Sequence, residues 1–234
     1  MQLFYNPNVS ENDDIFYFEK DESRHITKVL RKNIGDTLQI TNGKGWLFTS
    51  ELTTINQKYC SAKIISKKHL EKRDYKLHVA VAPTKMNDRF EWFLEKATEI
   101  GIDSITPILC DHSERKVIKT ERFEKIIQSA MKQSLQFYLP ELRPLIPFKA
   151  FIKQDISGQR FIAHCEDSER KSLKSEIKPN SDITILIGPE GDFSTKEIET
   201  AIAVGFAPVM LGETRLRTET AAIVACHSVA YANE

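Results

Sequence analysis

The sequence of 234 residues lacks the features that are typical of zinc-binding, disulfide-rich, membrane-spanning and secreted proteins. Its four cysteines are scattered without a CxxC pair, which argues against a zinc site and a disulfide framework and indicates buried, reduced thiols. No apolar run approaches the roughly 20 residues that cross a bilayer. The first residues show neither the basic start nor the apolar centre of a signal peptide. We therefore expect a cytoplasmic protein with no membrane partner and no metal.

Charge of one sign is not in excess either, because 33 lysines and arginines balance 33 aspartates and glutamates. This balance argues against non-specific coating of nucleic acid, but it permits recognition of one structured site through local basic patches. The sequence has no GxGxxG after a strand and no GKS or GKT P-loop, which disfavours a nucleotide-dependent α/β enzyme of another class. No helix-turn-helix or zinc signature supports a DNA-binding role.

Residues 1–72 are rich in short β-prone segments. We expect strands at 3–4, 15–18, 37–41, 46–53 and 60–66, with turn signals at Gly35-Asp36 and Asn42-Gly43. One short helix is expected near Asp21, with His25, Val29 and Leu30 on one face. Many strands and one helix predict a small β-barrel domain, joined to the rest of the chain by the basic segment 66–73.

Basic side chains cluster around that short helix, at Arg24, Lys28, Arg31 and Lys32. On charge alone, the cluster is as consistent with a solvated face as with a face that contacts the phosphates of a nucleic acid. Both interpretations stay open until other features of the chain are considered.

Residues 73–234 alternate between strands and helices, which is the pattern of a parallel sheet with helical crossovers. Strands are expected at 77–82, 105–109, 160–165, 183–187 and 208–211, and helices are expected to begin near Asp88, Thr120, Ser194 and Thr218. This alternation predicts an α/β domain with a mostly parallel sheet. No element is predicted for residues 141–158, and the charged run 167–178 is expected to face solvent.

Two glycine-containing loops follow two of these strands. The first runs from Gly188 to Phe193 and leads into a helix whose start carries a capping box, Ser194 with Glu197. The second covers residues 212–217 and precedes the last helix. Ligands of open α/β sheets bind at the carboxyl ends of strands, so two such loops on adjacent strands would form one pocket, which the strand end at 164–166 should also face. Two ordinary βα turns are the alternative.

The first loop, GPEGDFS (Gly188 to Ser194), and the second, LGETRLRTETA (Leu211 to Ala221), together resemble the RsmE family of 16S ribosomal RNA uridine-N3 methyltransferases. That family belongs to the SPOUT class of S-adenosylmethionine (SAM) enzymes. Weaker similarity extends along nearly the whole chain and includes HITKVLR (His25 to Arg31). The chain departs from the family pattern at Asp192, where glycine is usual, and at Thr214-Arg215, where Arg-Ile is usual.

The resemblance implies a fold, a reaction and partners. It implies a PUA-like β-barrel domain over residues 1–72 that contacts RNA, followed by a SPOUT methyltransferase domain over residues 73–234 with a C-terminal trefoil knot. The implied reaction is SAM-dependent methylation of N3 of uridine 1498 in 16S ribosomal RNA, by direct in-line transfer. The implied partners are 16S ribosomal RNA or the small ribosomal subunit and a second copy of the chain. A non-catalytic RNA-binding protein with a methyltransferase-like fold is the alternative.

Methylation at uridine N3 makes clear chemical demands. Loss of the N3 proton places negative charge on the flanking carbonyl oxygens, so the protein must position two ligands and stabilise an anion. Arg217 is expected to stabilise the anion, although it could instead tie the loop to Glu219 or Glu190. Glu219 is the candidate base, with capping of the last helix as the alternative. His25 and His112 are weaker candidates for the base.

The resemblance also implies two sets of binding residues. SAM is expected to be held mainly by main-chain groups of two loops, at Gly188, Pro189, Glu190, Gly191, Leu211, Gly212, Leu216 and Thr218. RNA is expected to be contacted by basic residues, at Arg24, His25, Lys28, Arg31 and Arg115.

Overall fold

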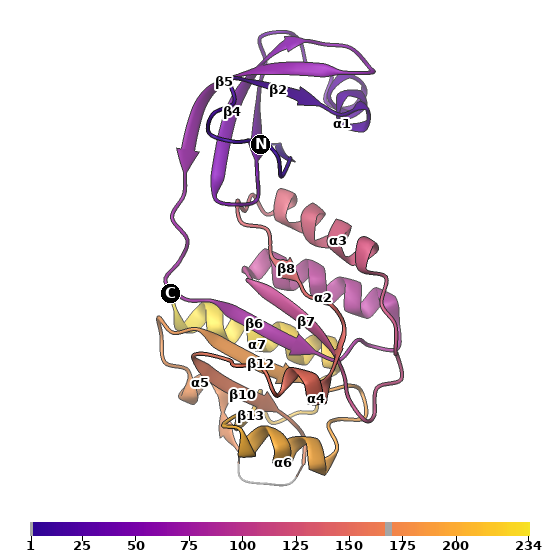
Figure 1. Ribbon diagram of the computed structural model, residues 1–234, viewed down its shortest axis with the longest axis vertical. Helices are drawn as coiled ribbons and strands as arrows, with labels where there is room; N and C mark the ends of the chain where they lie inside the picture. The colour runs from indigo at the N-terminus through magenta and orange to yellow at the C-terminus, as the bar shows by residue number, and fades with distance from the viewer. Residues whose placement is uncertain (1, 167–169) are drawn as a thin grey trace. The chain divides into compact units, whose positions relative to one another are not determined.

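The computed structural model describes residues 2–166 and 170–234 (Figure 1). The chain forms two compact units. The first comprises Met1–Lys72 together with Met131–Leu139, and the second comprises Arg73–Ala130 together with Pro140–Glu234. The chain therefore leaves the first unit, builds part of the second, and returns to the first for nine residues before completing the second.

The first unit is built on a five-stranded sheet with the order β1-β3-β4-β5-β2. Its strands are β1 (Leu3–Tyr5), β2 (Ile15–Phe18), β3 (Thr37–Thr41), β4 (Trp46–Thr54) and β5 (Cys60–His69). The sheet curls, because the ring of Phe4 on one edge strand lies 5.2 Å from the ring of Phe18 on the other. Both rings belong to a core that also contains Ile26, Ile40 and Phe48. The prediction of a small, curled β domain is confirmed, but β5 extends into the segment expected to be a link.

The single helix of this unit differs from the expected one. Helix α1 (Lys20–Arg24) continues into a π-helical turn, η1 (His25–Val29). The buried residues are Ser23 and Ile26, whereas Val29, expected on the inner face, is exposed. Ser23 fixes this orientation, because its hydroxyl donates to the Phe18 carbonyl at 3.2 Å and accepts from the Cys60 amide at 2.8 Å.

The segment Met131–Leu139 packs on the turn between β3 and β4. The Gly45 amide donates to the Phe137 carbonyl at 2.9 Å, and the Leu139 amide donates to the Gly43 carbonyl at 2.9 Å. Gly45 has a φ of 91°, and a Cβ at this position would lie 2.3 Å from the Tyr138 hydroxyl oxygen. The turn thus needs glycine both for its backbone conformation and for space.

The second unit is built on an eight-stranded sheet whose described pairings are all parallel. Along the path β11-β13-β10-β12-β6-β7-β8 the strands pair in turn, and β9 pairs with β7. Their bounds are β6 (Leu77–Val81), β7 (Ser104–Leu109), β8 (Glu141–Leu142), β9 (Ile146–Pro147), β10 (Gln159–Ala163), β11 (Lys171–Ser172), β12 (Ile183–Ile187) and β13 (Ala207–Met210). The predicted α/β fold is confirmed.

Helices cover both faces of this sheet (Figure 1). The helices after residue 73 are α2 (Asn87–Ile100), α3 (Thr120–Gln133), α4 (Phe148–Phe151), α5 (Leu173–Glu176), α6 (Thr195–Ala203) and α7 (Thr218–Ala232), and α3 packs on α2 through the rings of Phe123 and Phe90. On one face, α4 and α6 share a core with sheet residues such as Ile162 and Leu186. On the other, α7 contacts β6 and β12, and α2 packs on α7. Strand side chains alternate between the faces, so strands covered on both sides are apolar throughout, as in β12.

Several local predictions need correction. Helix α2 starts at Asn87 after the N-cap residue Met86, so Asp88 lies in its first turn and makes no side-chain cap. The run expected to face solvent includes the buried Leu173 of α5, and its residues 167–169 lie outside the described part of the chain. Among the cysteines, Cys165 is exposed and the other three are buried. In the described residues, no helix has both the length and the apolar character to cross a bilayer.

Candidate active site

Three parallel strands end side by side at the candidate site. The two glycine-containing loops follow β12 and β13, which were expected to be adjacent, but β10 lies between them. Ala163, the last residue of β10, pairs with Ile187 of β12 and with Val209 of β13, so the three strands end at nearly the same level. The loops therefore still meet at one edge of the sheet, and the end of β10 lies between them.

Two adjoining cavities occupy this edge. The β13 cavity has a volume of about 380 Å³ and is lined by Ala163, His164, Cys165, Arg170, Val209, Met210, Leu211, Gly212, Glu213, Thr214, Arg215, Leu216 and Ala221. The β12 cavity has a volume of about 280 Å³ and is lined by Ala163, Cys165, Ile187, Gly188, Pro189, Glu190, Asp192, Arg215, Leu216, Arg217, Thr218 and Ala221. The five shared residues make this a continuous hollow, which is of the size that small-molecule cofactors occupy.

Seven of the eight residues expected to bind SAM line this hollow. Gly191 does not line either cavity. Its carbonyl accepts a hydrogen bond from His112 Nδ1 at 3.1 Å, and a Cβ at Gly191 would lie 3.2 Å from the His112 Cβ. Gly191 therefore permits close packing of two loops, and His112, a candidate base, is engaged in that packing.

Hydrogen bonds between loops hold the hollow in shape. The Thr218 hydroxyl donates to the Gly188 carbonyl at 3.1 Å and so joins the start of α7 to the first loop. The Glu190 carboxylate accepts from the Lys85 amide at 2.9 Å, which joins the same loop to the segment after β6. The capping-box residue Glu197 is buried. Its carboxylate is satisfied there, because it also accepts a hydrogen bond from the Asp111 amide at 3.0 Å.

Asp192 occupies the position where the family usually has glycine. Its φ of 64° lies in the left-handed region, which glycine prefers and aspartate tolerates. Its carboxylate accepts from the Cys165 amide at 2.6 Å and from its neighbour Phe193 at 2.8 Å. The departure thus adds a bond between the first loop and the end of β10.

His164 is a buried polar side chain of the β13 cavity whose ring could form hydrogen bonds to a ligand. It is buried, and within the described chain neither ring nitrogen has a hydrogen-bond partner. Burial and the neighbouring Arg170 lower the pKa of His164. A neutral imidazole offers one donor and one acceptor. The strand end at 164–166 was expected to face the pocket, whereas Arg170 has no signal in the sequence that places it there.

Arg217 and Glu219 lie where the second loop becomes α7. Arg217 is the N-cap residue and is exposed; its carbonyl accepts from the Ala221 amide at 2.7 Å, whereas its guanidinium has no hydrogen bond or ion pair with any described residue. Arg215, not Arg217, approaches the Glu190 carbonyl, at 3.5 Å. Glu219 is buried and makes no side-chain cap; its Oε1 lies 3.8 Å from Arg89 Nε, and its Oε2 has no partner among the described residues.

Comparisons with known proteins identify the family. Residues 71–230 match the family described as RNA methyltransferase domain, and residues 18–65 match the RNA methyltransferase PUA domain. The ribosomal RNA small subunit methyltransferase E of Buchnera aphidicola (subsp. Acyrthosiphon pisum) is 33% identical over 94% of this chain and 90% of its own length. The chain belongs to the ribosomal RNA small subunit methyltransferase E family. This confirms the RsmE resemblance.

Solved structures of RsmE-type proteins share the architecture of both units. The crystal structure of a probable rRNA-methyltransferase from Porphyromonas gingivalis has a TM-score of 0.92 at 42% identity, covering 100% of this chain and 98% of that one. The ribosomal RNA small subunit methyltransferase E of Neisseria gonorrhoeae, solved with bound S-adenosyl methionine, has a TM-score of 0.84 at 26% identity, covering 97% and 95%. The predicted fold class, a PUA-like domain with a SPOUT-type methyltransferase domain, is thereby confirmed.

The residues of the hollow fit the cofactor of this family. The loops present main-chain groups at Gly188, Leu211 and Gly212, and a Cβ at Gly212 would meet no atom within 4 Å. His164 adds a buried imidazole that lacks a partner in the described chain. Polar groups of this kind are nearly always paired in folded proteins, so a ligand that hydrogen-bonds the imidazole suits the cavity.

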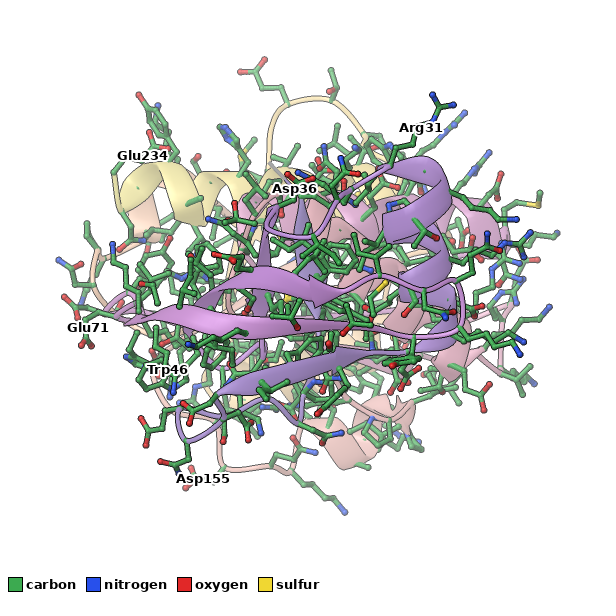
Figure 2. All side chains as sticks on the ribbon, turned by 90° about the horizontal axis from the view of Figure 1, so that it is seen from above. Arg31, Asp36, Trp46, Glu71, Asp155 and Glu234 are labelled. Atoms are coloured by element: carbon green, nitrogen blue, oxygen red, sulfur yellow. The ribbon has the colours of Figure 1, made fainter. Side chains whose placement is uncertain are left out.

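In this RsmE-family chain, the residues expected to bind RNA differ in their exposure and in the hydrogen bonds that they already make within the fold. Arg24, Lys28 and Arg31 are exposed on or just after α1 and η1, and Figure 2 shows the Arg31 side chain pointing away from the ribbon. His25 is half-buried, with Nε2 3.1 Å from Gln2 Nε2. Arg115 donates to the carbonyls of Thr84 at 3.0 Å and Lys85 at 2.6 Å, so part of its guanidinium is already used within the fold.

Proposed function

We propose that this protein transfers the methyl group of SAM to N3 of one uridine in small-subunit ribosomal RNA, the nucleotide known as uridine 1498 of 16S RNA. The observation that carries the proposal is the continuous hollow at the ends of β10, β12 and β13, which is also lined by the Arg217 guanidinium, a group without a partner among the described residues. Membership of the RsmE family supports the choice of substrate.

The hollow is the proposed SAM site. When bound, SAM supplies a methyl group on a positively charged sulfur, which a nucleophile attacks in line. Main-chain groups of the two loops, at the seven lining residues predicted from the sequence, hold this cofactor, and the neutral His164 donates one hydrogen bond and accepts another. The bonds of Thr218, Glu190 and Asp192 between loops keep these groups in place.

Arg217 and Glu219 are the proposed catalytic residues. Glu219 accepts the N3 proton of the uracil, because its Oε2 is available for a hydrogen bond. The developing negative charge on the uracil oxygens is stabilised by the Arg217 guanidinium, which lines the β12 cavity and is not neutralised by a carboxylate of the described chain. A fixed cation beside a forming anion lowers the barrier more than it strengthens substrate binding.

The proposal extends to the remaining features that the family resemblance implies. They are a homodimer, a C-terminal trefoil knot, action in the cytoplasm on 16S ribosomal RNA or the small subunit, and phosphate contacts by Arg24, His25, Lys28, Arg31 and Arg115. The exposed basic side chains of α1 and its continuation support the phosphate contacts.

Replacement of Arg217 tests this mechanism. We expect Arg217→Ala to lower the single-turnover rate of methyl transfer by about 100-fold or more, as removal of an anion-stabilising donor does, while SAM affinity changes less than threefold. Rates are measured with labelled SAM and small ribosomal subunits that lack the modification, and affinity by calorimetry. Arg217→Lys, which keeps the charge but not the planar fork, is the matched control and should keep part of the rate. An unchanged rate in the alanine variant contradicts the electrostatic role, and a wild-type chain that binds no SAM supports the non-catalytic alternative.

A further inference from the structure

A third cavity lies between the amino-terminal ends of α2 and α7, outside the hollow assigned to SAM. Its volume is about 410 Å³ and its lining residues are Asp88, Arg89, Trp92, Arg217, Glu219 and Thr220. Arg217 lines both this cavity and the β12 cavity. The two spaces therefore adjoin at this side chain, so a ligand in the third cavity would lie next to the site assigned to SAM.

The polar groups that line this cavity include one buried acceptor and two donors. Glu219 is 6% exposed, and its Oε2 has no hydrogen-bond partner in the described chain. Its Oε1 lies 3.8 Å from Arg89 Nε, which is an ion pair but is longer than a hydrogen bond. Arg89 comes from α2, whereas Arg217 and Glu219 come from the start of α7. Asp88 adds a second, exposed carboxylate at the rim.

An aromatic ring completes the cavity. Trp92 lies three residues after Arg89 in α2, so both side chains lie on the same side of the helix. Its side chain is 44% exposed, although an indole of this size is usually mostly buried. An exposed ring beside a polar cavity offers a surface on which a nucleic-acid base can stack.

We propose that this third cavity binds the uracil of the substrate and selects it against cytosine. The inference rests on the proposed function, because it places the methyl acceptor next to the site assigned to SAM. The edge of uracil presents acceptor, donor and acceptor, at O2, N3–H and O4. Arg89 and Arg217 supply donors and Glu219 supplies an acceptor, which is the set of groups that this edge needs.

Cytosine is disfavoured by the same groups. Its N3 is an acceptor that would face the Glu219 carboxylate, and its 4-amino group is a donor that would face a guanidinium. Two of the three contacts would thus become repulsive. Stacking on Trp92 is insensitive to the identity of the base and adds affinity, so the selection depends on Glu219 and the two arginines.

The intrinsic fluorescence of Trp92 gives a direct test. The chain has two tryptophans, Trp46 and Trp92, so Trp46→Phe leaves Trp92 as the only indole. We expect hexauridylate to quench this fluorescence saturably, and hexacytidylate to bind at least tenfold more weakly. Adding Glu219→Gln, which replaces an acceptor with a group that can also donate, should bring the two affinities within about threefold of each other. Absence of a uridine-dependent quench, or a preference that survives Glu219→Gln, overturns the proposal.

Substitution of Trp92 separates this inference from the proposed function. In anisotropy titrations with labelled hexauridylate, Trp92→Ala should weaken binding by about tenfold, and Trp92→Phe should restore it to within about threefold. SAM affinity by calorimetry should not change in either variant. If Trp92→Ala alters only the oligomeric state and leaves hexauridylate binding intact, Trp92 is a contact between copies and the base site is wrong. If hexauridylate binds as expected but SAM does not, the proposed function fails and the base site stands.

Discussion

At the scale of single residues, a side chain added at Gly212 would enter the β13 cavity without contacting its neighbours in the fold. A Cβ there would meet no atom within 4 Å, yet the residue lines the β13 cavity. The φ of 158° at Gly212 strains any other residue, so we expect Gly212→Phe and Gly212→Ala to lose similar stability, and Gly212→Phe alone to weaken SAM binding by at least 100-fold, because the ring would occupy the hollow. Gly212→Ala is the matched control and should keep SAM affinity within about tenfold. Thermal unfolding and calorimetry measure the two effects, and unchanged affinity in the phenylalanine variant would contradict the site.

His78 gives a prediction about pH at the same scale. It is a half-buried residue of β6 whose Nε2 lies 2.8 Å from the Thr106 hydroxyl, and desolvation, with a smaller effect of Arg143, lowers its pKa to about 3. The unfolded chain takes up a proton near pH 6.5, whereas the folded chain does not, so this residue lowers the stability as the pH falls from about 6.5 toward 3. Above that window its contribution is fully present.

Chemical denaturation at two pH values measures this effect. Between pH 7.5 and pH 5, His78 should account for a loss of about 2 kcal/mol in the free energy of unfolding. His78→Asn, which can still hydrogen-bond but does not titrate, should be less stable at pH 7.5 and should lack this part of the pH dependence. Identical pH dependence in both proteins would show that the histidine is not held neutral in the folded chain.

Single residues also show which details the sequence can predict. The capping box of Ser194 and Glu197 was predicted because it depends only on residues three apart, and the structure confirms it. The second acceptor role of Glu197, toward the Asp111 amide, depends on the distant end of β7, so it has no local signal. The lack of a hydrogen-bond partner for the His164 ring among the described residues likewise depends on every element around it.

At the scale of elements, the link between the first loop and α7 decides whether the hollow keeps its shape. This link is the hydrogen bond from the Thr218 hydroxyl to the Gly188 carbonyl. We expect Thr218→Val to lower the free energy of unfolding by about 1–2 kcal/mol, because a buried carbonyl loses its partner, and to weaken SAM binding. Thr218→Ser keeps the hydroxyl and should be close to wild type in both measurements. Equal SAM affinity in the valine and serine variants would show that the link does not shape the site.

Elements differ in how far the sequence predicts them. Segments with strong apolar patterns were predicted well, because β12 has the bounds expected of it and α7 begins at the expected Thr218. The π-helical turn after α1 was missed, because the spacing of apolar residues in so short a segment does not distinguish it from an α-helical turn. Strands β8, β9 and β11 have two residues each, which is too short for any pattern to identify.

At the scale of the whole molecule, the order of strands was the feature that the sequence could not supply. The two glycine loops were expected on adjacent strands, but β10 lies between β12 and β13, and its end contributes His164 and Cys165 to the hollow. The return of Met131–Leu139 to the first unit could not be predicted from the sequence either. It depends on the contact of Tyr138 with a glycine turn about ninety residues earlier in the chain. Local patterns specify elements, whereas long-range pairing specifies which elements meet.

The central claim is that this chain methylates N3 of a single uridine in small-subunit ribosomal RNA. Methylation at N3 blocks Watson–Crick pairing, so reverse transcriptase stops at the modified base. Primer extension across the ribosomal RNA should therefore show one stop that disappears when the protein is removed from the cell and returns when wild-type protein, but not the Arg217→Ala variant, is restored. An identical set of stops with and without the protein would contradict the claim.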